Sequence, residues 1–536
     1  MIRTRAGWTA GALLLFTGLA IVHTWPLASA PGTWSRNDNG DTVLHEWIMA
    51  WVAHQLPRDP VHLFDANILY PERHTLAYSD PLIVQGVLGA PLLWAGWSPV
   101  LAYNVVLILG FALTGWTTCL VVERWTGRKL AGILSGTLVA FNAFSLTRLP
   151  QIQDLHLEFF PLVLFALDRL LDAPRMKHAL QLAGWYVLQA LTGQYLLAFT
   201  AISAVVATLA RPFEWIGPRF KPAARAVLLS AIVALLLLTP VLLPYWYARA
   251  EVGLGRSLEE TAMYSAEVTD YFATGGRLHE AIWSRRFFQG DALFPGVTAL
   301  FLAGAALFSG VAFKDHRARM AAAIALVTFA LSFGPGLFLY RWLYVVFPLM
   351  SGIRGAVRFG QITLVAIGLL AGFGLARFID RLHARPAMLL GGALILIANI
   401  EACRAPLGYF EYRGIPAIYD ELDNLPSDAV LVWIPFPSSG QWHLNAPFML
   451  VSTRTFHRML NGYSGFKPPS YYDHANALAS FPDERSVEYL KQAGVTHVLV
   501  DSRNLSGERI DRLSEFPALR LAATDGNLRI FQLTSP

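Results

Sequence analysis

Charged residues are scarce in this chain. Only 15% of its 536 residues are charged, whereas 54% are hydrophobic. About a quarter of a soluble domain is normally charged, so this composition argues against an ordinary water-soluble protein. The chain also has only two cysteines, Cys119 and Cys403, and each lies within an apolar run. Two cysteines cannot by themselves supply a disulfide framework or the four ligands of a structural zinc site.

Motifs that bind nucleotides or metals are missing as well. No Walker-type phosphate loop is present, which argues against an ATP-driven pump within this chain. His45, His54, His62 and His74 are scattered without the spacing of metal ligands, so they predict no metal site. The formal charge of +5 does not indicate nucleic-acid binding, because Lys and Arg fall in short loops between apolar runs.

Long apolar runs recur through the first three quarters of the sequence. Each is close to the length that crosses about 30 Å of hydrocarbon as an α-helix. The runs predict an all-α polytopic membrane domain of about eleven transmembrane helices over residues 1–403. The predicted spans are residues 7–28, 99–122, 130–145, 156–171, 179–193, 195–210, 223–243, 293–312, 320–337, 358–376 and 387–403.

The segment from Pro81 to Trp97 decides the orientation of the later spans. It is short and contains two prolines, and we interpret it as an interfacial or re-entrant helix that does not cross. All the short basic loops then lie on the same side as the basic N-terminus, as the positive-inside rule requires. These loops are residues 123–129, 168–178, 211–225, 313–319 and 377–385.

The sequence therefore predicts a multi-pass protein of the inner (plasma) membrane with a cytoplasmic N-terminus. Loops on the outer face are expected at residues 30–99, 146–155, 244–292 and 338–357. Ala28-Ser29-Ala30 resembles a signal peptidase site, but the preceding apolar run is longer than an ordinary signal sequence, which favours an uncleaved first span. With either outcome, the chain from Pro31 onward emerges on the outer face.

The character of the chain changes after Cys403. Apolar stretches of strand type, Val430 to Ile434 and Thr496 to Val500, alternate with a helical stretch from Asp483 to Ala493. Residues 404–536 are thus predicted to form a soluble α/β domain on the outer face, periplasmic or extracellular. Its length is ordinary for one domain.

The first outer loop carries an acidic pair, Asp38 and Asp41, before a stretch that extends to Gln55. Trp47 and Trp51 share one face at helical spacing, so this stretch predicts an amphipathic helix on the membrane surface with Asp41 as its N-cap. Asp41, with Asp38 beside it, can then act as general base or as ligand for a cation that bridges a phosphate. An ordinary N-cap in a solvated turn is the alternative.

Two further polar segments are expected on the outer face. The segment from Leu146 to Glu158, at the outer ends of the spans 130–145 and 156–171, contains four ionisable residues: Arg148, Asp154, His156 and Glu158. Ionisable groups at membrane depth are costly and usually face a cavity or a partner. Arg354 and Arg358 precede a later span, and their guanidinium groups suit a phosphate or diphosphate of a substrate, or the phosphates of membrane lipids.

This layout resembles the GT-C superfamily of membrane glycosyltransferases. The resemblance rests on the inside N-terminus, the acidic first loop, the interfacial segment before the second span, the second polar turn and the outer tail. It implies that Asp41, in Gly40-Asp41-Thr42, matches the acidic residue proposed as base or metal ligand, and that Asp154 or His156 matches the second polar residue. The spacing of Asp38 and Asp41 departs from the tight acidic pair of many members.

The resemblance implies transfer of a sugar from a polyprenyl-phosphate donor to a glycan, lipid or protein acceptor. In such a reaction Arg354 or Arg358 stabilises the leaving phosphate. No cofactor is identified by the sequence, although a divalent cation would be compatible with the acidic residues. A non-enzymatic lipid-glycan transporter or flippase is the alternative, but such a protein needs polar groups through the membrane interior, where few are found.

Overall fold

The computed structural model describes residues 2–36, 40–288 and 290–534. Its contacts group the chain into two compact units. The helical unit comprises Met1–Pro31, Asn104–Pro240 and Gly255–Gly408, and the mixed unit comprises Gly32–Tyr103, Val241–Leu254 and Tyr409–Pro536. The tail from residue 404 thus clusters mainly with the first predicted outer loop, and the predicted independence of residues 404–536 stays a prediction.

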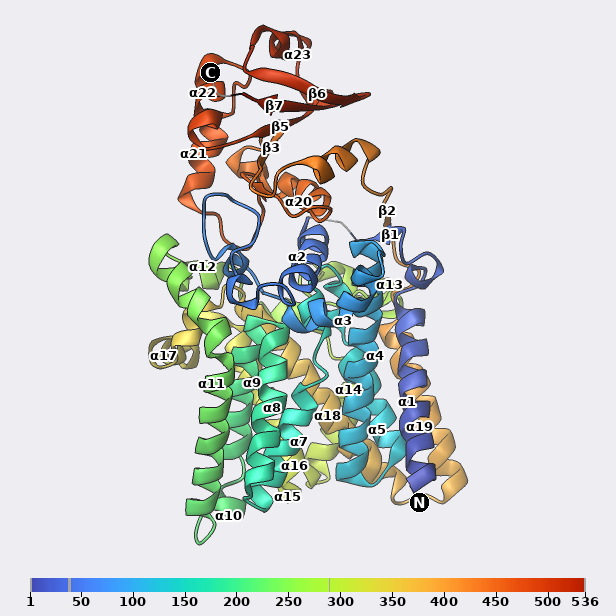
Figure 1. Ribbon diagram of the computed structural model, residues 1–536. Helices are drawn as coiled ribbons and strands as arrows, with labels where there is room; N and C mark the ends of the chain where they lie inside the picture. The colour runs from blue at the N-terminus through green and yellow to red at the C-terminus, as the bar shows by residue number, and fades with distance from the viewer. Residues whose placement is uncertain (1, 37–39, 289, 535–536) are drawn as a thin grey trace. The chain divides into compact units, whose positions relative to one another are not determined.

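A bundle of α-helices forms the helical unit (Figure 1). Each of the eleven predicted spans coincides with a helix, which confirms the mostly helical fold class. These helices are α1 Ile2–His23, α4 Pro99–Thr126, α5 Lys129–Ala140, α7 Phe160–Asp172, α8 Met176–Thr192, α9 Gln194–Leu209, α11 Phe220–Val252, α14 Val297–Phe308, α16 His316–Ser332, α18 Phe359–Ile379 and α19 Ala384–Ala402.

Six helical segments of the described chain have the length and apolar composition that a membrane crossing needs. They are Ala6–His23, Pro99–Thr126, Lys129–Thr147, Phe220–Val252, Ala356–Ile379 and Ala384–Ala402. The chain is therefore a multi-pass membrane protein. The count of eleven spans and their orientation stay predictions, because helices such as α7 and α14, with 13 and 12 residues, are short for a full crossing.

Helix α18 is the centre of the helical unit, where it packs against α5, α14 and α16. Glycines allow these close contacts. A Cβ at Gly374 would lie 2.0 Å from the carbonyl oxygen of Leu302 in α14, and one at Gly372 would lie 2.1 Å from the hydroxyl of Ser135 in α5. Small residues thus let neighbouring backbones approach, as is common between membrane helices.

A buried carboxylate connects four segments of the helical unit. Asp168 of α7 accepts hydrogen bonds from Trp125 Nε1 of α4 at 3.1 Å, Arg211 Nη1 at 2.6 Å and Arg317 Nε of α16 at 2.9 Å. Arg211 is fully buried and also pairs with Asp172 at 2.6 Å. His316 lies 3.2 Å from Asp168. The charges therefore neutralise one another inside the protein, where an unpaired charge would be very costly.

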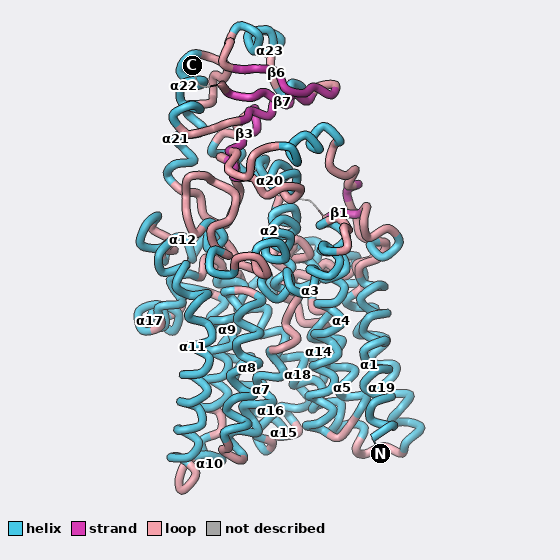
Figure 2. The backbone as a smooth tube through the Cα atoms, viewed as in Figure 1, coloured by secondary structure: helices cyan, strands magenta, loops and turns pink. Residues whose placement is uncertain are grey.

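The mixed unit contains all the strands of the described chain (Figure 2). Its main sheet has the order β4-β3-β5-β7-β6. Strands β4 Arg458–Met459, β3 Val430–Ile434 and β5 His497–Asp501 are parallel, whereas β7 Leu528–Leu533 and β6 Leu519–Asp525 form an antiparallel hairpin beside them. The predicted strand 430–434 is confirmed, and that at 496–500 is confirmed with a shift of one residue.

The mixed unit also contains several helices. α22 Glu484–Gln492 begins where Asp483 caps it, as the predicted helical stretch indicates. α2 Asp41–Gln55 packs against α3 Ile83–Trp94 and α20 Ala446–Ser452. α3 has 12 residues, about 18 Å at 1.5 Å per residue, which is shorter than the hydrocarbon layer. A short antiparallel pair joins β1 Trp34–Ser35 to β2 Phe410–Glu411.

We expect cysteines at the exposed positions Ser257 and Ser506 to react with a membrane-impermeant thiol reagent in intact cells. A cysteine at exposed Lys177 should not react, because it lies in a basic loop that we predict to be cytoplasmic. The background protein would lack Cys119 and Cys403. Labelling of position 177 but not of position 506 would reverse the predicted orientation and place α3 across the membrane.

Asp168→Asn should lower the melting temperature of the purified protein strongly, since it leaves the buried Arg211 guanidinium without its main counter-charge. Breaking a buried ion pair in this way costs about 3 to 5 kcal/mol. Asp380→Asn is the control, because the Asp380–Arg128 pair, at 2.7 Å, is about half exposed and should contribute less than about 1 kcal/mol. Equal melting shifts in the two variants would contradict the importance of the buried network.

Candidate functional site

Asp41 is the first residue of α2, not its N-cap, so the predicted capping role is wrong. The N-cap is Gly40, whose φ of 86° is in the left-handed region that glycine adopts without strain. A Cβ on Gly40 would also lie 3.2 Å from the carbonyl oxygen of His443. The Asp41 carboxylate instead accepts a hydrogen bond of 2.6 Å from the Tyr463 hydroxyl. Asp38, the other predicted catalytic acid, lies outside the described residues.

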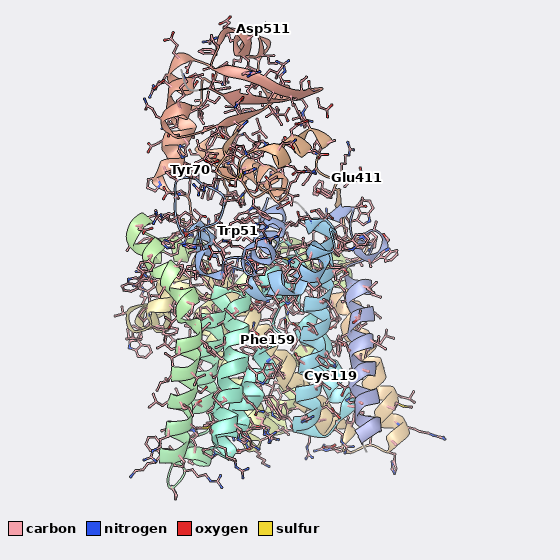
Figure 3. The ribbon with its side chains drawn as sticks, viewed as in Figure 1. Trp51, Tyr70, Cys119, Phe159, Glu411 and Asp511 are labelled. Atoms are coloured by element: carbon pink, nitrogen blue, oxygen red, sulfur yellow. The ribbon has the colours of Figure 1, made fainter. Side chains whose placement is uncertain are left out.

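Helix α2 is buried in the mixed unit and does not present a face to a membrane surface. Every residue from Thr42 to Ala53 is buried, so the predicted amphipathic surface helix is wrong. Trp47 and Trp51 do stack, with ring centroids 6.5 Å apart, but their indole N–H groups donate to Asn67 Oδ1 and the carbonyl of Leu63. Trp51 is labelled in Figure 3. The two tryptophans therefore hold the first-loop chain against α2, which gives Asp41 a rigid support.

A second acid on α2, Glu46, was not singled out from the sequence. Its side chain is 1% exposed, and one carboxyl oxygen accepts a hydrogen bond of 3.2 Å from Ser35 Oγ. The other oxygen, Oε2, has no hydrogen-bond partner among the described residues. Burial raises the pKa of Glu46 to about 8, although the bond from Ser35 opposes this. The sequence feature that could have identified it is a single acidic residue, Glu46, within the mainly apolar stretch 43–53.

The helical unit brings two predicted site residues together. Asp154, 2% exposed in the turn before α7, lies with Oδ1 3.4 Å from Arg358 Nη1 at the start of α18. Its other carboxylate oxygen has no hydrogen-bond partner among the described residues. Gln361 Nε2 donates to the Asp154 carbonyl and, at 3.2 Å, to Ser145 Oγ. Asp154, Arg358 and Gln361 thus connect the second polar turn to the segment that carries the arginines. Both segments are predicted to lie on the same face.

An aromatic residue that the sequence reasoning missed, Tyr195 of α9, organises the two arginines. The Arg358 guanidinium lies 4.4 Å from the centre of its ring, and its hydroxyl accepts the backbone N–H of Arg354 at 3.1 Å. Arg354 also lies 3.4 Å from Glu260 and donates to the Tyr264 hydroxyl. A phosphate at either arginine would thus share it with a carboxylate, and the two differ in burial: Arg358 is held more deeply, between Tyr195 and Asp154.

The remaining predicted binding residues form pairs of their own. His156 is fully buried, with Nε2 3.2 Å from the carbonyl of Val106 and Nδ1 2.9 Å from Glu158. A carbonyl can only accept, so Nε2 donates, and one further proton must lie between Nδ1 and Glu158. The pair is therefore neutral overall wherever that proton resides. Arg148 forms an ion pair with Asp291.

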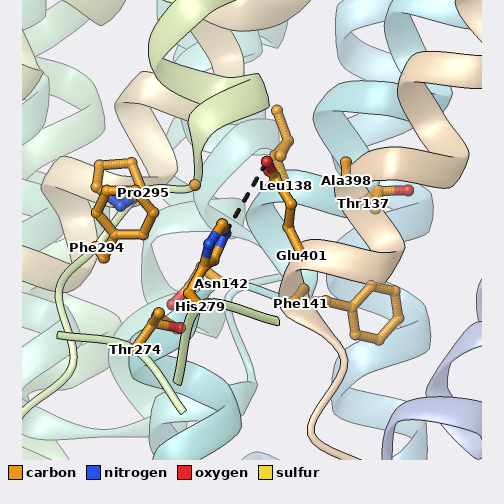
Figure 4. Close-up of a pocket in the computed structure, with 13 residues that line it drawn as sticks. Thr137, Leu138, Phe141, Asn142, Thr274, His279, Phe294, Pro295, Ala398 and Glu401 are labelled. Atoms are coloured by element: carbon orange, nitrogen blue, oxygen red, sulfur yellow. Dashed lines mark ion pairs between the residues drawn. The ribbon is translucent and has the colours of Figure 1, made fainter. Parts of the chain in front are cut away.

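A small cavity in the helical unit is lined by His279 and Glu401 (Figure 4). The His279 ring, 3% exposed, has neither nitrogen hydrogen-bonded within the described residues, and Nε2 is 3.9 Å from Glu401 Oε1. The other carboxylate oxygen accepts the backbone N–H of Thr298 at 3.1 Å. The cavity has a volume of about 20 Å³, which is enough for one water molecule to bridge the two side chains.

One group of three side chains in the described chain has metal-ligand proximity: Asp168, Asp172 and His316. Their ligand atoms lie within 4.8 Å of one another. Arg211 and Arg317 already donate to these carboxylates, however, so a cation there would meet two guanidinium groups. The group is better explained as the ion-pair network of the helical unit.

No protein-family model matches the sequence, and no curated protein matches it. Among solved structures, the arabinofuranosyltransferase AftD from Mycobacteria aligns with a TM-score of 0.65 over 99% of this chain, at 14% sequence identity. The chain has a GT-C fold. A variant of AftD aligns with a TM-score of 0.60 at 13% identity, over 99% of this chain and 42% of AftD. ArnT from Cupriavidus metallidurans, bound to undecaprenyl phosphate, gives 0.48 at 14% identity, over 97% and 98% of the two chains.

The shared fold agrees with the fold that the resemblance implies. The chain spans about two fifths of the length of AftD, since the first alignment covers 40% of that protein. At these identities the likeness concerns the fold of membrane glycosyltransferases.

Glu46→Gln should change how the stability of the protein depends on pH. The folded-state pKa of Glu46 is about 8, compared with an ordinary value of 4.5, so the folded protein binds more protons between these values. Stability therefore falls as pH rises through this range, by about 1.4 kcal/mol per pH unit. Gln cannot titrate, and the variant should gain in melting temperature relative to the original protein between pH 5 and pH 8.5.

Glu421→Gln serves as the control for this experiment, because Glu421 is an exposed acid of the same mixed unit. Its melting temperature should follow that of the original protein at every pH. If Glu46→Gln also follows the original protein across the range, Glu46 is not a buried carboxylic acid.

Proposed function

We propose that this protein is a membrane glycosyltransferase that moves a sugar from a polyprenyl-phosphate donor to an acceptor on the outer face of the cytoplasmic membrane. The GT-C fold supports this class of activity. The observation that carries the site assignment is the Asp41 carboxylate, which is fixed at the start of a buried helix by a 2.6 Å hydrogen bond from Tyr463. A partly buried carboxylate that is oriented by such a bond suits the role of a general base.

In the proposed reaction, Asp41 acts as general base. The carboxylate takes the proton of an acceptor hydroxyl while that oxygen attacks the anomeric carbon of the donor sugar. The bond between this carbon and the phosphate oxygen breaks, and the electron pair leaves with the polyprenyl phosphate. Inversion at the anomeric carbon is expected from this single displacement.

Arg358 is the better of the two arginines for the leaving phosphate. Its guanidinium is oriented by Tyr195 and lies 3.4 Å from Asp154, so the geometry of its donors is fixed before substrate binds. Arg354 also has a carboxylate at 3.4 Å, that of Glu260, but its side chain is more exposed, so its donors are held less firmly. His156, Glu158 and Arg148 then support the segment that carries Asp154.

The proposed activity is tested with the purified full-length protein and a panel of radiolabelled polyprenyl-phosphate sugars. Asp41→Asn should fold normally, because Asn can still accept the Tyr463 hydrogen bond, but should lose about 100 to 10,000-fold in turnover through loss of the base. Asp38→Asn should have a smaller effect, since Asp38 is farther from the helix start in sequence.

Asp59→Asn is the matched control, because Asp59 is a surface acid of the same mixed unit that pairs with His62 at 2.7 Å. It should keep full turnover. Near-normal turnover of Asp41→Asn would refute the assigned base. Movement of lipid-linked glycan across proteoliposomes without any sugar transfer would instead identify a transporter.

A further inference from the structure

Tyr463 supplies the hydrogen bond to Asp41 from a position 422 residues later in the chain. At 2.6 Å the contact is in the range of strong hydrogen bonds from a hydroxyl to a carboxylate. The Tyr463 hydroxyl therefore helps to select the orientation of the Asp41 side chain at the start of the helix. Here Gly40 takes the N-cap position and no side-chain cap bond forms, so the orientation of Asp41 depends on contacts from elsewhere.

The segment that carries Tyr463 is held rigidly. Two residues earlier, the buried Asn461 side chain accepts the backbone N–H of Trp433 at 2.7 Å and donates to the carbonyl of Trp433 and to Asn445 Oδ1. Its own carbonyl accepts the backbone N–H of Leu69 at 3.1 Å. A fully bonded buried amide of this kind fixes one backbone position with little freedom.

The ring of Tyr463 is also confined. It packs against a buried apolar cluster made of Val43, Val100, Ala446 and Leu450. The Trp442 ring meets it edge-on, with centroids 5.1 Å apart and an angle of 77°. The hydroxyl is therefore delivered to Asp41 by a side chain that cannot easily turn away.

We propose that Tyr463 is a positioning residue for the base. This role rests on the proposed function, in which Asp41 is that base. Its hydroxyl holds one carboxylate oxygen so that the carboxylate plane has a single orientation toward the acceptor hydroxyl. Tyr463 itself does not exchange a proton with substrate. The benefit arises only when the acceptor proton is transferred, so it affects the chemical step more than binding.

The test compares four full-length variants with the original protein in the radiolabelled transfer assay: Tyr463→Phe, Tyr412→Phe, Asp41→Asn and the double variant Asp41→Asn with Tyr463→Phe. Tyr463→Phe should lower kcat by about 10 to 100-fold and leave KM unchanged, because misorientation of a reacting group can cost on the order of 100-fold. In the Asp41→Asn background the same change should have almost no further effect on kcat, because the group that it orients is no longer a base.

Tyr412→Phe is the matched control. Tyr412 is half-buried and packs against the same apolar cluster. The hydrogen bond to Asp41 comes from Tyr463, so Tyr412→Phe removes a hydroxyl and leaves that bond intact. It should keep the original kcat. Melting temperatures of all four variants verify that each protein is folded.

Three results would overturn the positioning role. They are an unchanged kcat for Tyr463→Phe, an equal loss of kcat for Tyr412→Phe, and an equal fold loss for Tyr463→Phe with and without the Asp41 carboxylate. The proposed function fails separately, and the positioning role with it, if Asp41→Asn keeps the original kcat or if the original protein transfers no sugar from any donor. A strong loss for Asp41→Asn with none for Tyr463→Phe rejects the positioning role alone.

Discussion

Hydrocarbon offers no hydrogen bonds, and this constraint explains most of the arrangement of the helical unit. Each backbone polar group within the membrane must be satisfied by the chain itself, so the apolar segments are helices. Ionisable side chains must find partners in the same way. The neutral pair of His156 and Glu158 forms beside Val106, just before α7. At the other end of the same helix, in segments predicted to be cytoplasmic loops, the buried Asp168 meets Trp125, Arg211 and Arg317. The buried ionisable side chains thus occur in a few groups whose charges compensate one another.

The sequence predicted the helices of this unit well because the length of an apolar run is itself the physical requirement. It placed Asp154 and Arg358 at the outer ends of two predicted spans, but it did not predict that the two side chains approach each other. The partners of Arg354 and Arg148 were not predictable, because Glu260 and Asp291 come from a loop whose path depends on tertiary packing. Tyr195 was equally hidden inside an apolar helix.

The errors around α2 have a common origin. Periodicity of Trp47 and Trp51 correctly predicted a helix, but it cannot tell a membrane surface from a protein surface that is supplied by later residues such as Ala446 and Leu450. The N-cap assignment failed for a related reason. Asp is a frequent N-cap, but a glycine just before it can enter the helix with a φ of 86°, a conformation that is strained for any residue with a Cβ.

Dependence of Asp41 on Tyr463 has a consequence for the synthesis of the protein. At the usual 5 to 20 residues per second, the ribosome needs about 20 to 80 seconds to add the 422 residues between the two side chains. During that interval α2 is present without the loop after β4 that carries Tyr463. A nascent or truncated chain that ends before residue 463 would carry the carboxylate but not its orientation, so maturation of the site would be one of the last events in assembly.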